Sequence, residues 1–494
     1  MSESFRKGFV SNVSFNAAAR IVAFMLQGVA NIILARLLLP SDYGVVSFAI
    51  IFVQFTLQFY DFGISASLVQ KKDATMDDIY TGFTLRIFIS LSAMVLISAA
   101  APLTRMFFDD EAVVLIIRVF SLLFPLYCCG FLSHTLLTRE LQFKKISFLE
   151  TLETAVSALT AITLAFAGMG YWSMVTATVT AAAVQALALN LSRRVPFRMR
   201  LNRESVQYMM GFGLPFAGAG FLTFAMFQTD KFIVGTSTGA TSLGYYVLAF
   251  NWGTVISTAV TGVLHNILFA TLSRIQDDKE RVKSAFFKVF EYAFLVALLA
   301  NMTLFVIADD FLYVILGRMT DKWMPALGAL RIFCFYGLFR VLAEMLRVLP
   351  MVQGKTQVLL RINFWTALVQ MVLIYPSLHL LGLEGAAAAV ALASVLPMFA
   401  FARYLNREMQ MTWTELAVPL KALCCAVVVA AVVYFVHAGR TPGLLLMIEK
   451  AAFSVAGFVL LHGLLSGWQV YKGAARLVRE IRTPARGVAG HGGE

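Results

Sequence analysis

The sequence of 494 residues has little of what a soluble enzyme needs: only 14% of its residues are charged, and six are histidines. Its five cysteines all lie inside hydrophobic stretches, as Cys128, Cys129, Cys334, Cys424 and Cys425. Neighbouring cysteines rarely bridge, and no metal-ligand spacing is present. The sequence therefore predicts no disulfide framework, no metal site and no cofactor. Because so little of the chain lies outside the hydrophobic stretches to form a catalytic domain, we expect a protein that is not an enzyme.

Hydrophobic residues, in contrast, make up 59% of the chain. They fall into about fourteen long stretches, the first at residues 10–39 and the last at 444–465; others lie at 43–68, 206–235, 243–268, 358–381 and 386–405. A membrane-spanning helix needs roughly 20 apolar residues to cross the hydrocarbon core. Helices are also the only open-chain structure that satisfies the backbone in lipid. The predicted fold class is therefore an all-α integral membrane protein with about 14 transmembrane helices.

The basic residues are unevenly distributed over the connections between these stretches. The net charge is +12, and of the 40 lysines and arginines 27 lie in alternate segments that begin with the N-terminus, 6 in the opposite segments and 7 inside spans. Cytoplasmic segments carry the excess of positive charge in membrane proteins. This pattern predicts that both termini are cytoplasmic, and it explains the basic charge without a nucleic-acid partner.

The first twelve predicted spans are organised as a repeat. The segment 33–49 aligns without a gap with 233–249, including Gly44 with Gly244. Weaker matches relate the segment 117–120 to 330–333 and the segment 166–168 to 380–382. Parallel repeats related by an axis along the membrane normal occur in transporters, with the substrate site at the repeat interface. We predict two six-helix bundles at 1–200 and 201–410, two extra helices at 411–470 and a basic cytoplasmic tail at 471–494.

Polar side chains form stripes along several spans when each residue turns by about 100°. The stripes comprise Asn12, Asn16, Arg20, Gln27 and Asn31; Gln54, Gln58, Asp61 and Ser65; and Asn251, Thr254, Thr258, Thr261 and His265. Charged groups cost at least about 2.5 kcal/mol each at the bilayer centre. Two interpretations stay open: the stripes line a water-filled cavity, or they join helices through hydrogen bonds.

The charged members of these spans allow several roles. Arg20 lies too deep to reach the lipid headgroups freely, and Asp61 could pair with it. Glu344 stands between Arg340 and Arg347, which gives either a self-neutralising ladder or an anion site. Because basic residues outnumber acidic ones inside the spans, the cavity is predicted to be net positive and to suit a phosphate-bearing anion.

Other charged residues are interpreted differently. We assign Arg86 to the inner surface as a snorkelling anchor. Asp309 and Asp310 are interpreted as the solvated acidic end of an outer loop. Asp61, Asp230 and His265 are the predicted candidates for ion coupling.

Several short segments together resemble bacterial polysaccharide exporters. They are residues 34–44 (LARLLLPSDYG), 59–63 (FYDFG), 68–71 (LVQK), 136–143 (LLTRELQF), 230–235 (DKFIVG), 243–246 (LGYY) and 272–278 (LSRIQDD). The resemblance covers most of the first twelve spans. It is to Wzx-type, colanic-acid-exporter-like flippases, in the superfamily that also contains multidrug/cation antiporters and lipid II flippases.

This resemblance implies two six-helix bundles in a V around a central cavity, in a bacterial inner membrane. It implies alternating-access translocation of an undecaprenyl-pyrophosphate-linked oligosaccharide from the cytoplasmic to the periplasmic leaflet, with the lipid-linked oligosaccharide and membrane lipids as partners and the polymerase machinery as a further partner. The family supplies no shared catalytic residue. From the stripes we therefore assign Arg20, Arg340 and Arg347 to the pyrophosphate, and Asn16, Gln27, Gln58 and Asn251 to sugar hydroxyls.

Two alternative functions stay open at this point. A multidrug/cation antiporter of the same superfamily predicts an acidic cavity and drug efflux. A polyprenyl-linked glycosyltransferase or polymerase predicts sugar turnover, for which the sequence has no Asp-x-Asp motif and no long outer loop.

Overall fold

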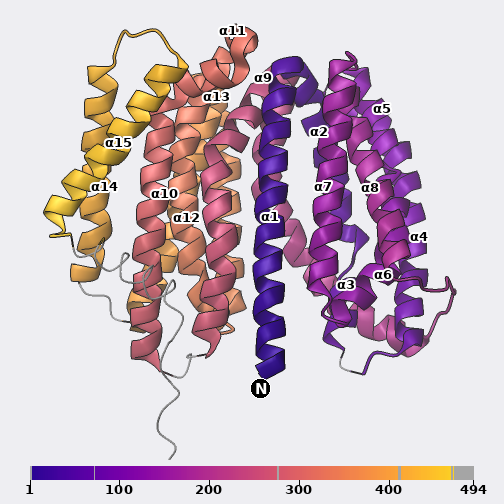
Figure 1. Cartoon of the computed structure of the whole chain (residues 1–494). Coiled ribbons are helices and arrows are strands. Elements are labelled where there is room, and N and C mark those ends of the chain that lie inside the picture. Colours follow the sequence, from indigo (N-terminus) through magenta and orange to yellow (C-terminus); the bar gives the residue numbers. More distant parts are fainter. Residues whose placement is uncertain are drawn as a thin grey trace, which may run out of the picture. The chain divides into compact units, whose positions relative to one another are not determined.

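The computed structural model describes residues 3–71, 73–108, 110–274, 278–409, 413–468 and 471, and over this part the chain is helical with short connections and no strand. Figure 1 shows the helices in order along the chain. They are α1 (Glu3–Leu37), α2 (Pro40–Tyr60), α3 (Ile64–Gln70), α4 (Met76–Ala100), α5 (Glu111–Phe120), α6 (Leu123–Arg139), α7 (Phe143–Phe166), α8 (Trp172–Ser192), α9 (Arg203–Arg274), α10 (Lys279–Leu316), α11 (Thr320–Trp323), α12 (Leu327–Val352), α13 (Thr356–Met409), α14 (Trp413–Val436) and α15 (Leu444–Leu465). Short 3₁₀ turns η1 (Ala101–Met106), η2 (Gly317–Met319) and η3 (Met324–Ala326) join some of them.

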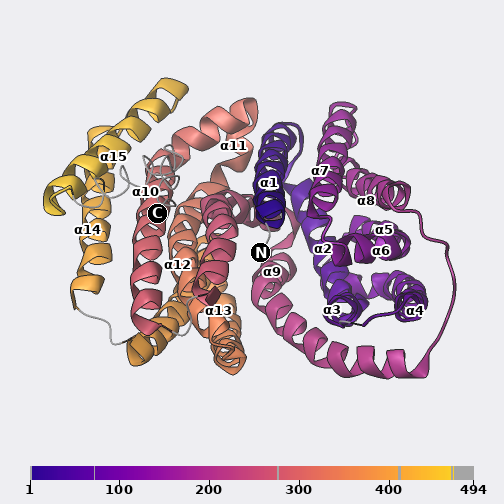
Figure 2. The same ribbon diagram turned by 60° about the horizontal axis from the view of Figure 1, so that its bottom comes forward.

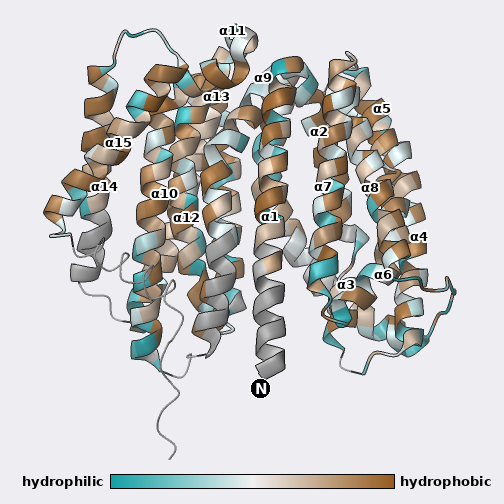
Figure 3. Cartoon of the chain, in the orientation of Figure 1, coloured by the Kyte–Doolittle hydropathy of each residue, from teal (hydrophilic) through white to brown (hydrophobic). Residues whose placement is uncertain are grey.

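These helices have the length and composition of membrane spans. Within the described part, ten helical stretches are long and apolar enough to cross a bilayer. The predicted spans fall on helical segments. Apolar residues dominate the middle of the helices in Figure 3, as expected where side chains contact lipid. The predicted all-α membrane fold is confirmed.

The chain packs as two compact units, each built from segments that are separate in the sequence. Unit 1 comprises Met1–Trp252, Ile315–Phe333 and Thr356–Pro397, and unit 2 comprises Gly253–Val314, Cys334–Lys355 and Met398–Glu494. The arrangement of the two predicted bundles, their boundaries after residues 200, 410 and 470, and the cytoplasmic placement of the termini stay predictions.

Two long helices are interrupted by glycine between predicted spans. α9 has a non-helical residue at Gly239, with φ of 81°, and α13 has one at Gly382, with φ of 62°. Glycine adopts such positive φ values without the steric penalty of a side chain. Gly239 separates the predicted spans 206–235 and 243–268, and Gly382 separates 358–381 and 386–405. The division into separate spans is therefore confirmed at both places.

The predicted span 43–68, in contrast, is not one helix. α2 ends at Tyr60 and α3 begins at Ile64, because Phe62 and Gly63 have φ values of 40° and 64°. The prediction of a continuous helix was wrong, since apolar composition does not report a left-handed turn. This break determines the position of the polar side chain that precedes it, Asp61.

The sequence repeat has a direct counterpart in the packing of unit 1. A Cβ atom on Gly44 would lie 1.8 Å from the backbone oxygen of Ala240, and one on Gly244 would lie 1.8 Å from that of Pro40. Pro40 and Ala240 are themselves equivalent positions in the repeat. The two segments that the sequence aligns thus contact each other reciprocally through their backbones. We call this contact the glycine crossing.

The first part of α9 is fastened to α4. Thr75 caps α4 and forms a capping box with Asp78, whose carboxylate also accepts hydrogen bonds from Lys71 at 2.7 Å and from Ser205 of α9 at 2.6 Å. Arg200, in the connection before α9, pairs with Asp77 at 2.6 Å. In Figure 2 this part of α9 curves past α3 and α4.

Candidate functional site

Unit 1 contains a polar cavity of about 340 Å³, which we call the unit 1 cavity. Helices α2, α3, α4, α6 and α8 supply its walls. The polar residues that line it are Asp61, Ser65, Arg86, Tyr127, His134 and Gln185, and the apolar ones include Leu126, Phe131 and Leu189. Ligand sites for small molecules have volumes in this range and combine apolar walls with a few polar groups.

An acid–base pair occupies one side of this cavity. The Nη1 atom of Arg86 lies 3.2 Å from Oδ1 of Asp61 and donates to Oγ of Ser65 at 3.1 Å. Ser65 in turn donates to Oδ1 of Asp61 at 2.7 Å. The pair exists because the left-handed turn after α2 brings the carboxylate of Asp61 over the first turn of α3.

Aromatic rings hold the guanidinium of Arg86 in place. Its central carbon lies 4.4 Å from the ring centre of Tyr60 and 4.6 Å from that of Phe131, as cation–π contacts require. The hydroxyl of Tyr60 donates to the backbone oxygen of Phe124 at 3.0 Å, which fixes that ring. Only 9% of Arg86 is exposed. A snorkelling anchor would extend to the surface, so this interpretation was wrong, and the partner of Asp61 is Arg86 rather than Arg20.

Helices α6 and α8 supply the other polar lining residues of the cavity. Tyr127 and His134 are two helical turns apart on α6 and therefore lie on the same face. Gln185 of α8 donates through its amide nitrogen to Glu153 of α7, so its carbonyl oxygen stays available. Sequence reasoning assigned no role to these three cavity residues, because none of them belongs to a polar stripe.

Several hydrogen-bonding groups around the cavity are uncommitted. Among the described residues, no hydrogen-bond partner is present for Oδ2 of Asp61, the hydroxyl of Tyr127, the ring of His134 or the side-chain oxygen of Gln185. Asp61, Tyr127 and Gln185 are half-buried and His134 is exposed, so these groups are accessible from the cavity. A set of available groups at the end of α2 and on α6 and α8 therefore marks this cavity as a place for a polar molecule.

The predicted substrate residues of unit 1 lie mainly on α1 and α2. Arg20 is exposed, and no other described residue bonds to it. Gln27 is exposed and donates to Asn31 at 3.1 Å, while Gln58 is half-buried and donates to the backbone oxygen of Gln54. Asn251 of α9 is exposed. The side chains of Asn16 and His265 lie outside the described part of the structure.

Asp230, a predicted coupling residue, is buried within unit 1. It is 2% exposed, and its Oδ2 accepts a hydrogen bond from the hydroxyl of Tyr246 at 3.0 Å. The adjacent Lys231 donates to the side chain of Gln228 at 3.2 Å and lies 4.7 Å from the ring centre of Phe250. Asp230 is thus a protected carboxyl group that does not line the unit 1 cavity.

Unit 2 holds the remaining predicted arginines, on α12. Arg347 pairs with Glu344 at 3.1 Å, one helical turn away, and Arg340 is half-buried. The pairing agrees with the ladder interpretation for Arg347. Binding of an anion by Arg340 or Arg347 stays a prediction.

Unit 2 also contains a sealed acid–base cluster where α10 meets α15. Lys450 lies 2.6 Å from Asp310 and 3.4 Å from Asp309, and the backbone N–H of Gly443 donates to Asp310 at 3.1 Å. Asp310 is fully buried and Lys450 is 5% exposed. The interpretation of these aspartates as a solvated loop end was wrong for Asp310, because a lysine far along the chain covers it.

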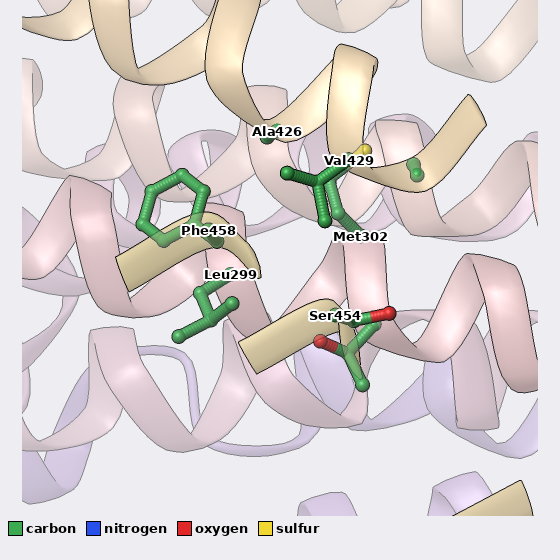
Figure 4. A pocket seen from close by; sticks show the side chains of 8 residues that line it. Leu299, Met302, Ala426, Val429, Ser454 and Phe458 are labelled. Atoms are coloured by element: carbon green, nitrogen blue, oxygen red, sulfur yellow. The ribbon is translucent and has the colours of Figure 1, made fainter. Parts of the chain in front are cut away.

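The space between α10, α14 and α15 is too small for a substrate. Figure 4 shows the cavity there, which measures about 10 Å³ and is lined by Leu299, Met302, Val429, Ser454 and Phe458 among others. That volume holds about one water molecule. No cluster of three or more histidine, cysteine or acidic residues suited to a metal ion occurs in the described ranges.

Comparison with known proteins identifies the family. Residues 33–327 match the family described as polysaccharide biosynthesis protein. The chain is 27% identical over 327 residues to the succinoglycan biosynthesis transport protein ExoT of Rhizobium meliloti strain 1021, covering 66% of each chain. It is 22% identical over 366 residues to the lipopolysaccharide biosynthesis protein WzxC of Escherichia coli strain K12, covering 73% of each.

The fold is also found among solved structures. The lipid II flippase MurJ, in an inward closed conformation, superposes with a TM-score of 0.75 at 10% identity, covering 91% of this chain and 98% of MurJ. Identity at that level shows a shared fold alone. The family match extends over more than half of the sequence and includes every helix that lines the unit 1 cavity. The chain therefore belongs to the polysaccharide biosynthesis protein family.

Proposed function

We propose that the protein is a flippase that moves an undecaprenyl-pyrophosphate-linked oligosaccharide from the cytoplasmic to the periplasmic leaflet of the bacterial inner membrane. The family match over residues 33–327 carries this proposal. Relatives named for succinoglycan transport and lipopolysaccharide biosynthesis support the saccharide, and the fold shared with a lipid II flippase supports the lipid carrier. It acts as a transporter and not as an enzyme.

The saccharide needs polar groups within the membrane, and unit 1 offers them. Polar groups of the protein that faced lipid would be costly. In a water-filled passage, the same groups can replace the hydrogen bonds that the saccharide makes with water. Arg20 suits a phosphate group because it is exposed and has no partner among the described residues. Asn16, Gln27, Gln58 and Asn251 are proposed for hydroxyl groups, and Arg340 and Arg347 for phosphate.

Movement of an anion toward the outside is favoured by an inside-negative membrane potential, by roughly 2.3 kcal/mol per charge per 100 mV. Arginines bound to the phosphates would reduce this gain. Ion coupling is a further part of the proposal, with Asp230 and His265 as the favoured candidates, because the third predicted candidate, Asp61, is already paired with Arg86 at 3.2 Å. It is tested by whether asparagine variants of the two aspartates, or His265→Gln, remove the dependence of export on a sodium or proton gradient.

The experiment is export of polysaccharide by a deletion strain that carries either the wild-type gene or Arg20→Ala. We expect the wild type to restore the polymer and Arg20→Ala to abolish it with normal protein levels. Arg105→Ala is the matched control, because Arg105 is an exposed arginine that pairs with Glu111. Normal export by the Arg20 variant would remove Arg20 from the site. A drug-sensitive deletion strain with unchanged polymer would instead favour a multidrug antiporter.

A further inference from the structure

The unit 1 cavity combines two features that together define a ligand class. Its charged lining residues are Asp61 and Arg86, which neutralise each other at 3.2 Å. Its other polar groups are the hydroxyl of Tyr127, the ring of His134 and the side-chain oxygen of Gln185, which have no hydrogen-bond partner among the described residues. The charges of Asp61 and Arg86 sum to zero, and the remaining polar groups of the cavity can form hydrogen bonds with a ligand.

A charged ligand is poorly served by such a cavity. An anion would find the guanidinium of Arg86 already bound to a carboxylate and a hydroxyl, and a cation would find Asp61 already bound to that guanidinium. Replacing either partner leaves a desolvated charge without compensation, which is costly. The Asp61–Arg86 pair therefore disfavours charged ligands of both signs.

A neutral ligand with several hydroxyl groups, in contrast, fits the available partners. Each hydroxyl group both donates and accepts a hydrogen bond. Oδ2 of Asp61 and the oxygen of Gln185 accept, while the hydroxyl of Tyr127 and the ring of His134 serve both purposes. Leu126, Phe131 and Leu189 provide apolar walls for the C–H face of a ring.

We propose that this cavity binds a neutral sugar ring. The inference rests on the proposed function, since the sugar would be one residue of the lipid-linked saccharide. The volume suits one or two rings and excludes a polyprenyl chain, which must stay in the lipid. In this role Asp61 and Arg86 determine specificity by cancelling each other's charge, and Tyr127 contributes a hydrogen bond.

The test uses the full-length protein in lipid nanodiscs and three probes: methyl β-glucopyranoside, its anionic glucuronide and its protonated 2-amino analogue. Binding is measured by saturation-transfer NMR, which detects the weak affinities expected of single sugars, on the order of millimolar. We expect the wild type to prefer the neutral glycoside. Asp61→Asn leaves the pair with a positive charge and should shift the preference to the glucuronide. Arg86→Gln leaves a negative charge and should shift it to the amino sugar.

Tyr127→Phe provides a variant that should fold normally, because its hydroxyl has no partner to lose among the described residues. Loss of one neutral hydrogen bond should weaken binding of the neutral glycoside about two- to tenfold. Tyr171→Phe, at the start of α8 and outside the cavity lining, is the matched control and should leave binding unchanged. Equal binding of the three probes by all variants, or no binding of the neutral glycoside by the wild type, would overturn the proposal.

The two proposals fail in different ways. If no glycoside binds while the gene still restores polymer to the deletion strain, the sugar cavity is wrong and the flippase stands. If the probes show the expected preferences while deletion of the gene leaves polymer export intact, the cavity stands and the flippase proposal is wrong.

Discussion

Two acid–base pairs inside the helices of this protein differ in what surrounds them. Asp310 and Lys450 are buried in unit 2, and both carboxylate oxygens of Asp310 are occupied, by Lys450 and by the N–H of Gly443. Asp61 and Arg86 lie beside a cavity in unit 1, and one oxygen of Asp61 accepts no hydrogen bond from any described residue. A satisfied pair holds helices together, whereas a partly satisfied pair beside a cavity is available to a ligand.

The largest effect on stability is expected at the buried pair of Asp310 and Lys450. Asp310→Ala leaves Lys450 buried without its main partner, which typically costs about 3–5 kcal/mol. We expect a clear loss of thermal stability for the purified protein in detergent. The double variant Asp310→Leu with Lys450→Met should recover most of that loss, since apolar residues of similar size can replace a buried pair. If both variants are equally unstable, the pair is not the cause.

The second prediction tests close packing without any change of charge, at the glycine crossing of α2 and α9. Gly44→Ala places a methyl group 1.8 Å from the oxygen of Ala240, so the backbones must separate. Overpacking of this kind costs about 1–3 kcal/mol, and Gly244→Ala should give a similar loss of thermal stability because the contact is reciprocal.

Gly28→Ala is the control for the crossing, since no atom lies within 4 Å of a Cβ at that position. We expect unchanged or slightly raised thermal stability there, because alanine favours the helix. Unequal losses at Gly44 and Gly244 would show that the two repeat-related contacts are not equivalent.

The Asp61–Arg86 pair should differ from the Asp310–Lys450 pair, because its loss should affect transport more than stability. Asp61→Asn keeps the hydrogen bond from Ser65 but leaves the buried guanidinium of Arg86 without its carboxylate, so we expect a stability loss of about 1–3 kcal/mol, below that at Asp310. Export of polysaccharide should nevertheless fall strongly, because the cavity gains a net charge. Comparing export with protein level and thermal stability in the same cells checks this. Normal export by Asp61→Asn would mean that the cavity has no part in transport.

The smallest effect is expected at an exposed pair, Lys355 with Glu408, where the two side chains lie 2.7 Å apart. The hydrogen bond to Glu408 raises the pKa of Lys355. The contribution of the Lys355–Glu408 pair to folding stability is therefore present at neutral pH. It is lost only as the pH rises through the raised pKa of Lys355, above about 10.4. Lys355→Met should lower stability by about 0–1 kcal/mol, measured by thermal unfolding at low and high salt.

These pairs also show how far the sequence alone predicts the molecule. Fourteen apolar stretches and the turns at Gly239 and Gly382 follow from composition and from the conformational freedom of glycine. The partner of Asp61 did not follow, because it depends on a left-handed turn at Phe62 and Gly63 that redirects the carboxylate. The burial of Asp310 did not follow either, since no local pattern reveals that a distant lysine covers its charge.

Of the polar residues that line the unit 1 cavity, the sequence indicated only Asp61 as a functional candidate. Arginines and amides on the polar stripes can be recognised because several fall on one helix face; Arg20 is exposed, and its role stays a prediction. Tyr127, His134 and Gln185 form no stripe. Their proximity arises from the packing of α8 against α6, which in turn packs against α4, and the sequence of any one helix does not contain this information.

The most direct test of the central claim is translocation by the purified protein in proteoliposomes that contain an undecaprenyl-pyrophosphate-linked oligosaccharide. An impermeant glycosidase added outside measures how much saccharide has reached the outer leaflet. The proposed function predicts that wild-type protein makes the inner-leaflet pool accessible and that Arg20→Ala protein does not. Equal accessibility in protein-free vesicles and in vesicles with wild-type protein would contradict it.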